Sequence, residues 1–329
     1  MLYGVKNPHG GDRYGDGIAL DFSANVSPLG TPKCVTEAIE RGLPELYRYP
    51  DPYCRALVQA IARYEGVPGE FILCGNGASE LIYAYCEAVR PGRAMELAPT
   101  FSEYSLALQR RGCGVVRFAL SQEEKFDLQE RFLARLACEK IDALFLCNPN
   151  NPTGEVRNKE DLKALVDSHP DKLFIFDQSY EYFTLKSLLG IKEAASFPNV
   201  ILLHSMTKQY AIPGLRVGYF TASEGLTDDV RCRRMPWSVN SLAIEAAKYL
   251  LEEGDGISAD IPQLLAERER LTNLLLATGM LEIWPTDTHY MLIKLRMGKA
   301  AALKDFLAVN HGILIRDASN FEGLDERFF

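Results

Sequence analysis

Seven short apolar runs, separated by stretches with helical periodicity, constrain the fold of this chain more than any other feature. Several are continuously apolar rather than alternating, which is typical of strands covered on both faces. They occupy residues 71–74, 94–98, 114–120, 143–147, 173–177, 200–205 and 217–222. Helical patterns lie between them at 78–89, 101–111, 127–139 and 158–169. This alternation predicts an α/β fold with a mainly parallel sheet and helices on both sides, although the Pro-Gly link before the last run also allows an antiparallel return.

The order of the predicted elements changes after about residue 235, where the regular alternation of strands and helices ends. Helical stretches at 240–254 and 258–278 precede an alternating segment, 281–295, that reads as a hairpin, and a helix at 299–310 and a strand at 312–317 follow. We therefore expect three parts, which are an N-terminal arm at 1–30 packed on the small domain, a large domain at 31–235 and a smaller α+β domain at 236–329.

Composition excludes several classes of protein. The 329 residues carry 36 basic and 44 acidic side chains, and a net charge of -8 argues against broad nucleic-acid binding. No run approaches the roughly 20 apolar residues of a membrane span. The polar, Gly-rich N-terminus lacks the apolar core of a secretory signal, so we expect a cytoplasmic protein. The eight cysteines form no C-x-x-C pair and the five histidines no H-x-x-x-H pattern, so free thiols are expected and no metal site.

Polar residues follow several of the predicted strands, and ligands of open parallel sheets bind at these carboxyl ends. After 71–74 comes "GNGASELI", where Gly77, Ala78 and Ser79 open a helix whose amides and dipole favour a phosphate. A Gly-rich turn capped by Ser79 explains the same residues. The pattern matches neither the P-loop nor the dinucleotide-binding fingerprint.

Aromatic and amide side chains stand at the next two strand ends. "PTFSEY" places Phe101 and Tyr104 where an aromatic ring either stacks on a flat ligand or covers the sheet as part of the core. "NPNNPTGEV" is rich in turn-forming residues, and Asn151 presents an amide at the edge of the sheet.

The last two parallel strands end in charged and hydroxyl residues. Asp177 ends the run "LFIFD", with Tyr180 three residues later, and a buried carboxylate requires a cation unless it caps a helix. After 200–205, whose last residue is Ser205, comes Lys208 and later Arg216. Burial would lower the pKa of Lys208 and make its amine a nucleophile, while the alternative is a lysine whose amine reaches solvent.

Together these residues supply a phosphate cradle, a stacking surface, an amide, a carboxylate, a phenol and an amine at one edge of one sheet. Pyridoxal 5′-phosphate, a planar aldehyde with a phosphate and a ring nitrogen, matches all of them. The residues therefore predict this cofactor, held as a Schiff base on Lys208.

Three segments carry a resemblance to a known family. "NPNNPTG", "FDQSY" and "SMTKQYAIPGLRVGY" resemble, in the same order, the signatures of the fold type I pyridoxal phosphate enzymes, the class I and II aminotransferase superfamily. The resemblance spans nearly the whole chain. It implies a large domain with a mainly parallel seven-stranded sheet and a smaller α+β domain.

The resemblance also implies roles for individual residues. Lys208 would be the Schiff-base lysine and proton shuttle, and Asp177 would pair with the pyridine nitrogen. Asn151 and Tyr180 would bind the phenolic oxygen, and Phe101 would lie over the ring. The residues expected to bind the phosphate are Gly77, Ala78, Ser79, Ser205 and Arg216. "YRYPD" resembles a segment whose tyrosine, here Tyr49, reaches the phosphate of the partner subunit, which implies a homodimer with shared active sites.

Within the superfamily the chain is similar to histidinol-phosphate aminotransferases and closer to threonine-phosphate decarboxylases of cobalamin biosynthesis. "HGG", "DFSANVSPLG" and "RDASNFEGLDERFF" carry this likeness, and in that group His9, Asn25 and Arg316 would meet the phosphate or carboxylate of a substrate. Decarboxylation of L-threonine O-3-phosphate is the leading hypothesis. Transamination of histidinol phosphate with 2-oxoglutarate is the alternative, and a protein of this fold that only binds the cofactor is a third.

The chain departs from this group at its end. Relatives continue beyond "RFF" with an arginine that binds the substrate α-carboxylate and with a final strand and helix, whereas this sequence stops at Phe329. We therefore expect a truncated small domain with impaired activity, or another group such as Arg327 in place of that arginine.

Overall fold

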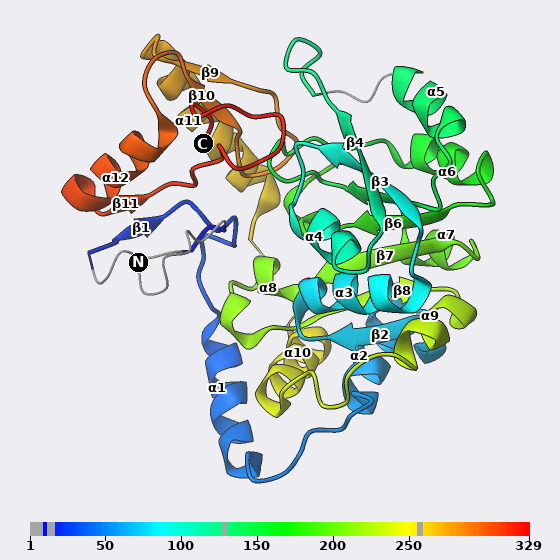
Figure 1. Ribbon diagram of the computed structural model, residues 1–329. Coiled ribbons are helices and arrows are strands. Elements are labelled where there is room, and N and C mark those ends of the chain that lie inside the picture. Colours follow the sequence, from blue (N-terminus) through cyan, green and yellow to red (C-terminus); the bar gives the residue numbers. More distant parts are fainter. Residues whose placement is uncertain (1–8, 12–16, 127–129, 255–258) are drawn as a thin grey trace.

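The computed structural model describes residues 9–11, 17–126, 130–254 and 259–329. A seven-stranded sheet with strand order β2-β8-β7-β6-β5-β3-β4 forms its centre (Figure 1). The strands are β2 (Ile72–Gly75), β3 (Arg93–Ala98), β4 (Gly114–Ala119), β5 (Ala143–Cys147), β6 (Leu173–Asp177), β7 (Val200–Ser205) and β8 (Gly218–Ala222). Only β8 runs antiparallel to its neighbours, so the mainly parallel sheet and the antiparallel return after Ser205 are both confirmed. Parts of the expected arm (1–8 and 12–16) and of two expected helices (127–129 and 258) lie outside the described residues.

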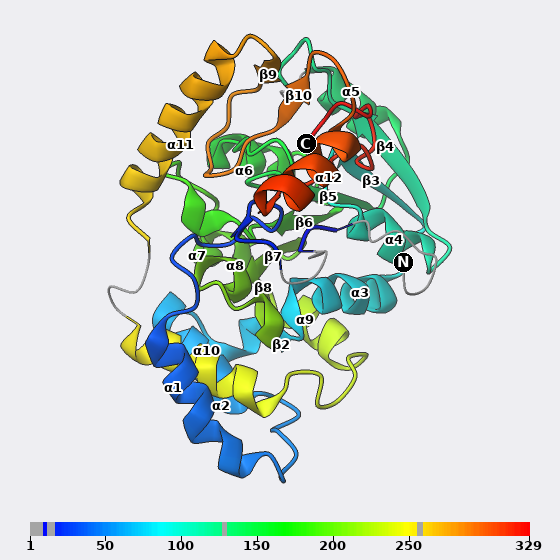
Figure 2. The same cartoon turned by 90° about the vertical axis from the view of Figure 1, so that its left-hand side faces the viewer.

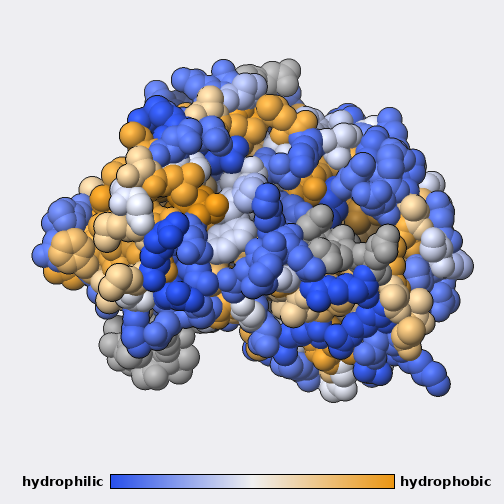
Figure 3. Space-filling model, turned by 90° about the horizontal axis from the view of Figure 1, so that it is seen from above, coloured by the Kyte–Doolittle hydropathy of each residue, from blue (hydrophilic) through white to orange (hydrophobic). Residues whose placement is uncertain are grey.

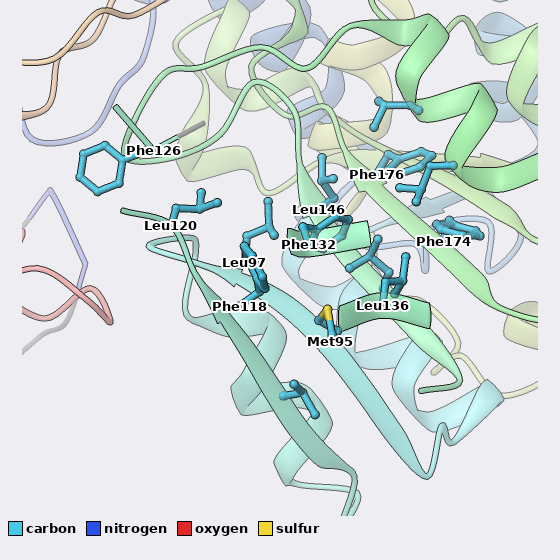
Figure 4. Close-up of a cluster of buried hydrophobic side chains, with 14 of the residues drawn as sticks. Met95, Leu97, Phe118, Leu120, Phe126, Phe132, Leu136, Leu146, Phe174 and Phe176 are labelled. Atoms are coloured by element: carbon cyan, nitrogen blue, oxygen red, sulfur yellow. The ribbon is translucent and has the colours of Figure 1, made fainter. Parts of the chain in front are cut away.

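Helices cover both faces of this sheet, which explains the continuously apolar strands. One face carries α3 (Gly77–Val89), α4 (Glu103–Gln109) and α9 (Glu224–Arg231), and the other carries α5 (Glu130–Cys138), α6 (Lys159–Asp167) and α7 (Ile191–Ala195). Side chains alternate between the two cores, so that on β5 Leu144 and Leu146 belong to one cluster while Phe145 and Cys147 belong to the other. Figure 4 shows the first cluster, in which Leu146 lies beside the α5 residue Phe132.

A third core cluster lies beyond the β2 edge of the sheet. Three helices that lie together in Figure 2 contribute to it. They are α1 (Lys33–Gly42), α2 (Arg55–Glu65) and α10 (Ser241–Glu253). The sequence patterns did not predict α1 and α2. Ala243 and Ala247 of α10 share this cluster with Leu57 of α2 and Ile72 of β2. The predicted domain boundary at residue 235 stays a prediction. Helix α10 follows this boundary in the chain, and it packs against α1 and α2, which precede it.

The C-terminal part combines short strands and two helices. They are α11 (Ile261–Ala277), β9 (Leu281–Ile283), β10 (Ile293–Leu295), α12 (Ala300–His311) and β11 (Ile313–Leu314). β9 and β10 pair antiparallel, as the hairpin pattern predicted. β11 is shorter than the expected strand at 312–317 and pairs in parallel with β1 (Leu20–Asp21), which ties the arm to this part. The other side of β10 is hydrogen-bonded to the last residues, through Ile293 and Phe329 in both directions.

Many large apolar side chains remain exposed. Those in and around the segments 43–53 and 235–237 include Leu43, Leu46, Tyr47, Tyr49, Tyr53, Met235 and Trp237, and those of the C-terminal part include Leu274, Leu276, Met280, Met297, Phe306 and Val309. Seen from above, hydrophobic colour gathers on the left of the molecule, the side of α11 and α12 in Figure 1 (Figure 3). Exposed apolar groups of this kind indicate contact surfaces. Among the described residues, no helix combines the length and the apolar character that crossing a membrane would require.

The double-sided core makes a stability prediction. Phe174 is fully buried between β5 and β7, and we expect Phe174→Ala to lower the free energy of unfolding by about 3–5 kcal/mol, because a large cavity forms in a rigid sheet face. Leu185→Ala, at a side chain that is 66% exposed, should change it by less than about 0.5 kcal/mol. Denaturant unfolding of both variants tests this, and equal losses would contradict the assignment of Phe174 to the core.

Candidate active site

A cavity at the carboxyl edge of the sheet brings together nine of the residues expected at the site. They are Ala78, Ser79, Phe101, Asn151, Asp177, Tyr180, Ser205, Lys208 and Arg216. Asp177 and Ser205 are the last residues of β6 and β7, and Asn151 lies in the turn that follows β5. Because these three strands are parallel neighbours, their polar ends meet at one edge.

The first turn of α3 and Arg216 form an anion cradle. Gly77 has φ +76, and a Cβ built on it would lie 2.2 Å from Nη2 of Arg216, so only glycine lets the guanidinium approach the loop. Arg216 itself has φ 58, a left-handed conformation that is strained for a non-glycine residue, and its Nη1 donates to the Pro213 carbonyl at 3.0 Å. The amides of Ala78 and Ser79 at the helix N-terminus and the guanidinium together favour a phosphate.

Asp177 is buried and both of its carboxylate oxygens accept hydrogen bonds. The Tyr104 hydroxyl donates to Oδ2 at 2.6 Å, and the Ser179 amide donates to Oδ1 at 2.9 Å. Burial, and then the charge of Asp177, raise the pKa of Tyr104 well above its usual value, so its hydroxyl stays protonated. The alternative role of Asp177 as a helix cap does not apply, because only the 3-10 turn Glu181–Phe183 follows and it has no side-chain cap.

Lys208 lies in the short helix α8 (Met206–Gln209), which follows β7, and it lines the cavity. Its Nζ is 5.9 Å from the ring centroid of Tyr180. Burial and then the nearby Arg216 lower the pKa of the Lys208 amine, while Asp177 partly opposes them. A larger fraction of this amine is therefore neutral than of an exposed lysine, which is what a nucleophile or a general base requires.

The phenol of Tyr180 has hydrogen bonds with two amide side chains. Nδ2 of Asn151 donates to the Tyr180 hydroxyl at 3.4 Å, a long hydrogen bond. Burial raises the pKa of Tyr180, and a hydrogen bond with the side chain of Asn25 partly opposes this shift. Asn25 therefore touches the site through Tyr180, although it does not line the cavity.

The remaining expected residues lie outside the cavity lining. His9 pairs through Nε2 with Glu103 Oε1 at 3.0 Å, and its ring centroid is 5.9 Å from that of Phe101. Arg316 donates to the Asp317 carbonyl and to Asn320 Oδ1, and the Arg327 guanidinium binds Asp325. Tyr49 is 82% exposed, and its ring packs against Trp237 at 5.1 Å.

Several residues near the site had no role assigned from the sequence. Thr207 lines the cavity and its hydroxyl is 2.8 Å from that of Ser205. Ile82 also lines it, and its place one helical turn after Ala78 could have indicated this. His289 packs against Phe183 at 4.0 Å, and burial and the charge of Lys208 lower its pKa to about 4, a proximity that no sequence pattern signals.

Comparison with known proteins covers nearly the whole chain. The sequence model of a family described as "Aminotransferase class I and II" matches residues 18–328. The chain is 36% identical to the threonine-phosphate decarboxylase of Salmonella typhimurium, over 94% of this chain and 85% of that protein. It resembles the solved L-threonine-O-3-phosphate decarboxylase from Porphyromonas gingivalis with a TM-score of 0.86 and 30% identity, over 94% of this chain and 92% of that one. The fold is also that of histidinol-phosphate aminotransferase from Sinorhizobium meliloti in complex with pyridoxal-5′-phosphate, with a TM-score of 0.81 and 24% identity over 89% and 80% of the two chains.

The lowered pKa of Lys208 predicts how the stability of the cofactor-free protein depends on pH. The unfolded chain binds a proton at Lys208 more tightly than the folded protein does, so this residue destabilises the fold at neutral pH and ceases to do so as the pH rises to about 10.5. Lys208→Met should therefore raise the unfolding temperature at pH 7, and the difference in unfolding temperature between this variant and the wild type should shrink towards pH 10.5. Calorimetry tests this, with the exposed Lys33→Met as the control. A lower unfolding temperature for Lys208→Met at pH 7 would contradict the burial of the charge.

Proposed function

This chain belongs to the aminotransferase class I and II family, and from that premise we propose that it decarboxylates L-threonine O-3-phosphate with pyridoxal 5′-phosphate as its cofactor. The observation that carries the choice of reaction is the likeness to threonine-phosphate decarboxylases, at 36% sequence identity over 94% of this chain and, for a solved structure, at a TM-score of 0.86. A phosphorylated amino acid is therefore the proposed substrate class.

The residues around the cavity fit the cofactor. Its phosphate would be held by the α3 amides together with Ser205 and Arg216, for which Gly77 leaves the space. Asp177 would hold the ring nitrogen, because it is a buried carboxylate at a strand end without a side-chain ion pair among the described residues. The remaining groups of the set are Asn151 and Tyr180 for the phenolic oxygen and Phe101 for the face of the ring.

Lys208 is the proposed catalytic base and acid. When bound, pyridoxal 5′-phosphate supplies an electron sink that weakens the bonds at the α-carbon of an amino acid. The neutral amine of Lys208, favoured by burial and by Arg216, can accept a proton and return it to the substrate α-carbon. The negative charge of Asp177 would keep the ring nitrogen protonated, and the buried Tyr180 phenol would remain a neutral hydrogen-bond donor.

The choice between decarboxylation and transamination depends on how the substrate carboxylate is oriented. We propose Asn25, His9 and Arg316 as the groups that bind the anionic ends of the substrate. Asn25 has the strongest structural support, because its side chain bonds to Tyr180. Burial lowers the pKa of Arg316, and its guanidinium binds its own loop through Asp317 and Asn320, so an anionic substrate would compete with these contacts.

Transamination of histidinol phosphate is the second candidate function. The fold shared with a histidinol-phosphate aminotransferase favours it, and Lys208 and Asp177 would serve both reactions equally. The two reactions differ in the bond that breaks at the α-carbon, which is the bond to the carboxylate in one case and the bond to hydrogen in the other.

We further propose that the protein is a homodimer in which Tyr49 completes the site of the partner subunit. Tyr49 is exposed, lies outside the cavity of its own chain and stands among other exposed apolar side chains that include Tyr47, Tyr53 and Trp237. A surface of this kind is suited to contact with a second protein.

A direct assay separates the two reactions. Protein reconstituted with pyridoxal 5′-phosphate should release CO2 from L-threonine O-3-phosphate, and glutamate-dependent turnover of histidinol phosphate should be much slower. Lys208→Ala should abolish both the visible absorption band of the bound cofactor and the release of CO2, because it removes the only lysine among the described residues that line the cavity. Exclusive transamination would overturn the decarboxylase proposal, and a cofactor band without any turnover would favour a binding-only protein.

Mixing two inactive variants tests the shared site. A mixed dimer of one Lys208→Ala subunit and one Tyr49→Ala subunit would contain one intact site, with Lys208 from the second subunit and Tyr49 from the first. Random pairing of equal amounts should therefore restore about a quarter of the wild-type activity. Activity no higher than that of the separate variants would show that Tyr49 serves its own subunit or no site.

A further inference from the structure

We propose that Tyr104 is a positioning residue for the reaction, which acts on the cofactor by holding the carboxylate of Asp177. The inference rests on the proposed function, because it concerns the acid that would hold the ring nitrogen. Tyr104 belongs to α4 and Asp177 to β6, and the two residues are 73 positions apart in the chain. Their 2.6 Å hydrogen bond connects a helix on one face of the sheet with the strand end that carries the acid.

Tyr104 is buried in the wall of the cavity, which its side chain helps to line. The residue is 1% exposed, and its ring packs against Phe101 at 5.6 Å and Phe145 at 5.5 Å, so the phenol is held on two sides. Burial and the charge of Asp177 keep the hydroxyl protonated, and towards a carboxylate a protonated phenol is the donor.

Holding the carboxylate matters because the group is buried. The Tyr104 hydroxyl and the Ser179 amide each bind one oxygen, which fixes the plane of the Asp177 carboxylate and leaves its remaining lone pairs for a partner in the cavity. Hydrogen bonds to an ionised group are stronger than those between neutral groups, and they stabilise its charge. A rotated or weakly solvated carboxylate would hold a protonated ring nitrogen less well.

Tyr85 provides a matched control within the same core cluster. It is 2% exposed, its ring contacts Phe145 at 5.8 Å edge-on, and its hydroxyl has no hydrogen-bond partner in the described ranges. Tyr85→Phe and Tyr104→Phe therefore remove the same atom from equally buried tyrosines that touch the same phenylalanine. Only Tyr104→Phe removes a hydrogen bond to Asp177.

The test measures cofactor affinity of the cofactor-free full chain by fluorescence quenching. Tyr104→Phe should raise the dissociation constant for pyridoxal 5′-phosphate by about tenfold or more, the loss expected for one hydrogen bond to a charged group. Tyr85→Phe should leave it within about twofold of wild type. The analogue 1-deazapyridoxal 5′-phosphate has a carbon in place of the ring nitrogen, so wild type and Tyr104→Phe should bind it with the same affinity.

A second readout is the steady-state kinetics of the loaded protein, in which Tyr104→Phe should lower kcat more than it changes KM. Unchanged affinity for pyridoxal 5′-phosphate in Tyr104→Phe would overturn the inference, as would an equal loss of affinity for the cofactor and its deaza analogue, since that pattern indicates only a packing role. Failure of the wild type to bind the cofactor would overturn the proposed function and the inference together. A wild type that binds the cofactor without releasing CO2 would contradict the decarboxylase proposal alone.

Discussion

The meeting of Lys208, Asp177 and Arg216 at one buried edge of the sheet is the constraint on which the rest of the structure depends. Burial lowers the pKa of Lys208 and of Arg216, so placing these cations there costs stability. Asp177 offsets part of that cost by its charge, and it is itself held by Tyr104 and Ser179. Buried charged groups that cost stability are typical of residues that bind a ligand or react. The cost of burying Lys208 and Arg216 therefore supports a functional role for this edge of the sheet.

The two-sided core is what makes this edge rigid. β5, β6 and β7 send alternate side chains into two separate clusters, so the strands cannot shift by one residue without moving Leu144 and Phe145 into the wrong cores. Asp177, the last residue of β6, is paired with Cys147 of β5 on one side and with Leu203 of β7 on the other.

The sequence predicted much of this because the decisive features are local. The runs at 143–147, 173–177 and 200–205 coincide with β5, β6 and β7. Each is a largely continuous apolar segment with a polar residue at its end or directly after it. Helices α1 and α2 were not predicted, and β11 was predicted too long because the strand pattern at 312–317 does not reveal that its neighbour β1 offers only two residues. The roles of Tyr104 and His289 depend on contacts between distant segments, which no local pattern reports.

The sequence by itself predicted a mainly parallel sheet and the chemical groups at its edge, because strand periodicity and the order of polar residues are properties of adjacent positions. The tertiary structure alone decided which groups touch. Gly77 meets Arg216, Tyr104 meets Asp177, and Asn25 meets Tyr180, across separations along the chain that only the folded packing of helix on sheet can close. It also decided that Tyr49 lies exposed outside the cavity of its own chain, where its ring packs against Trp237.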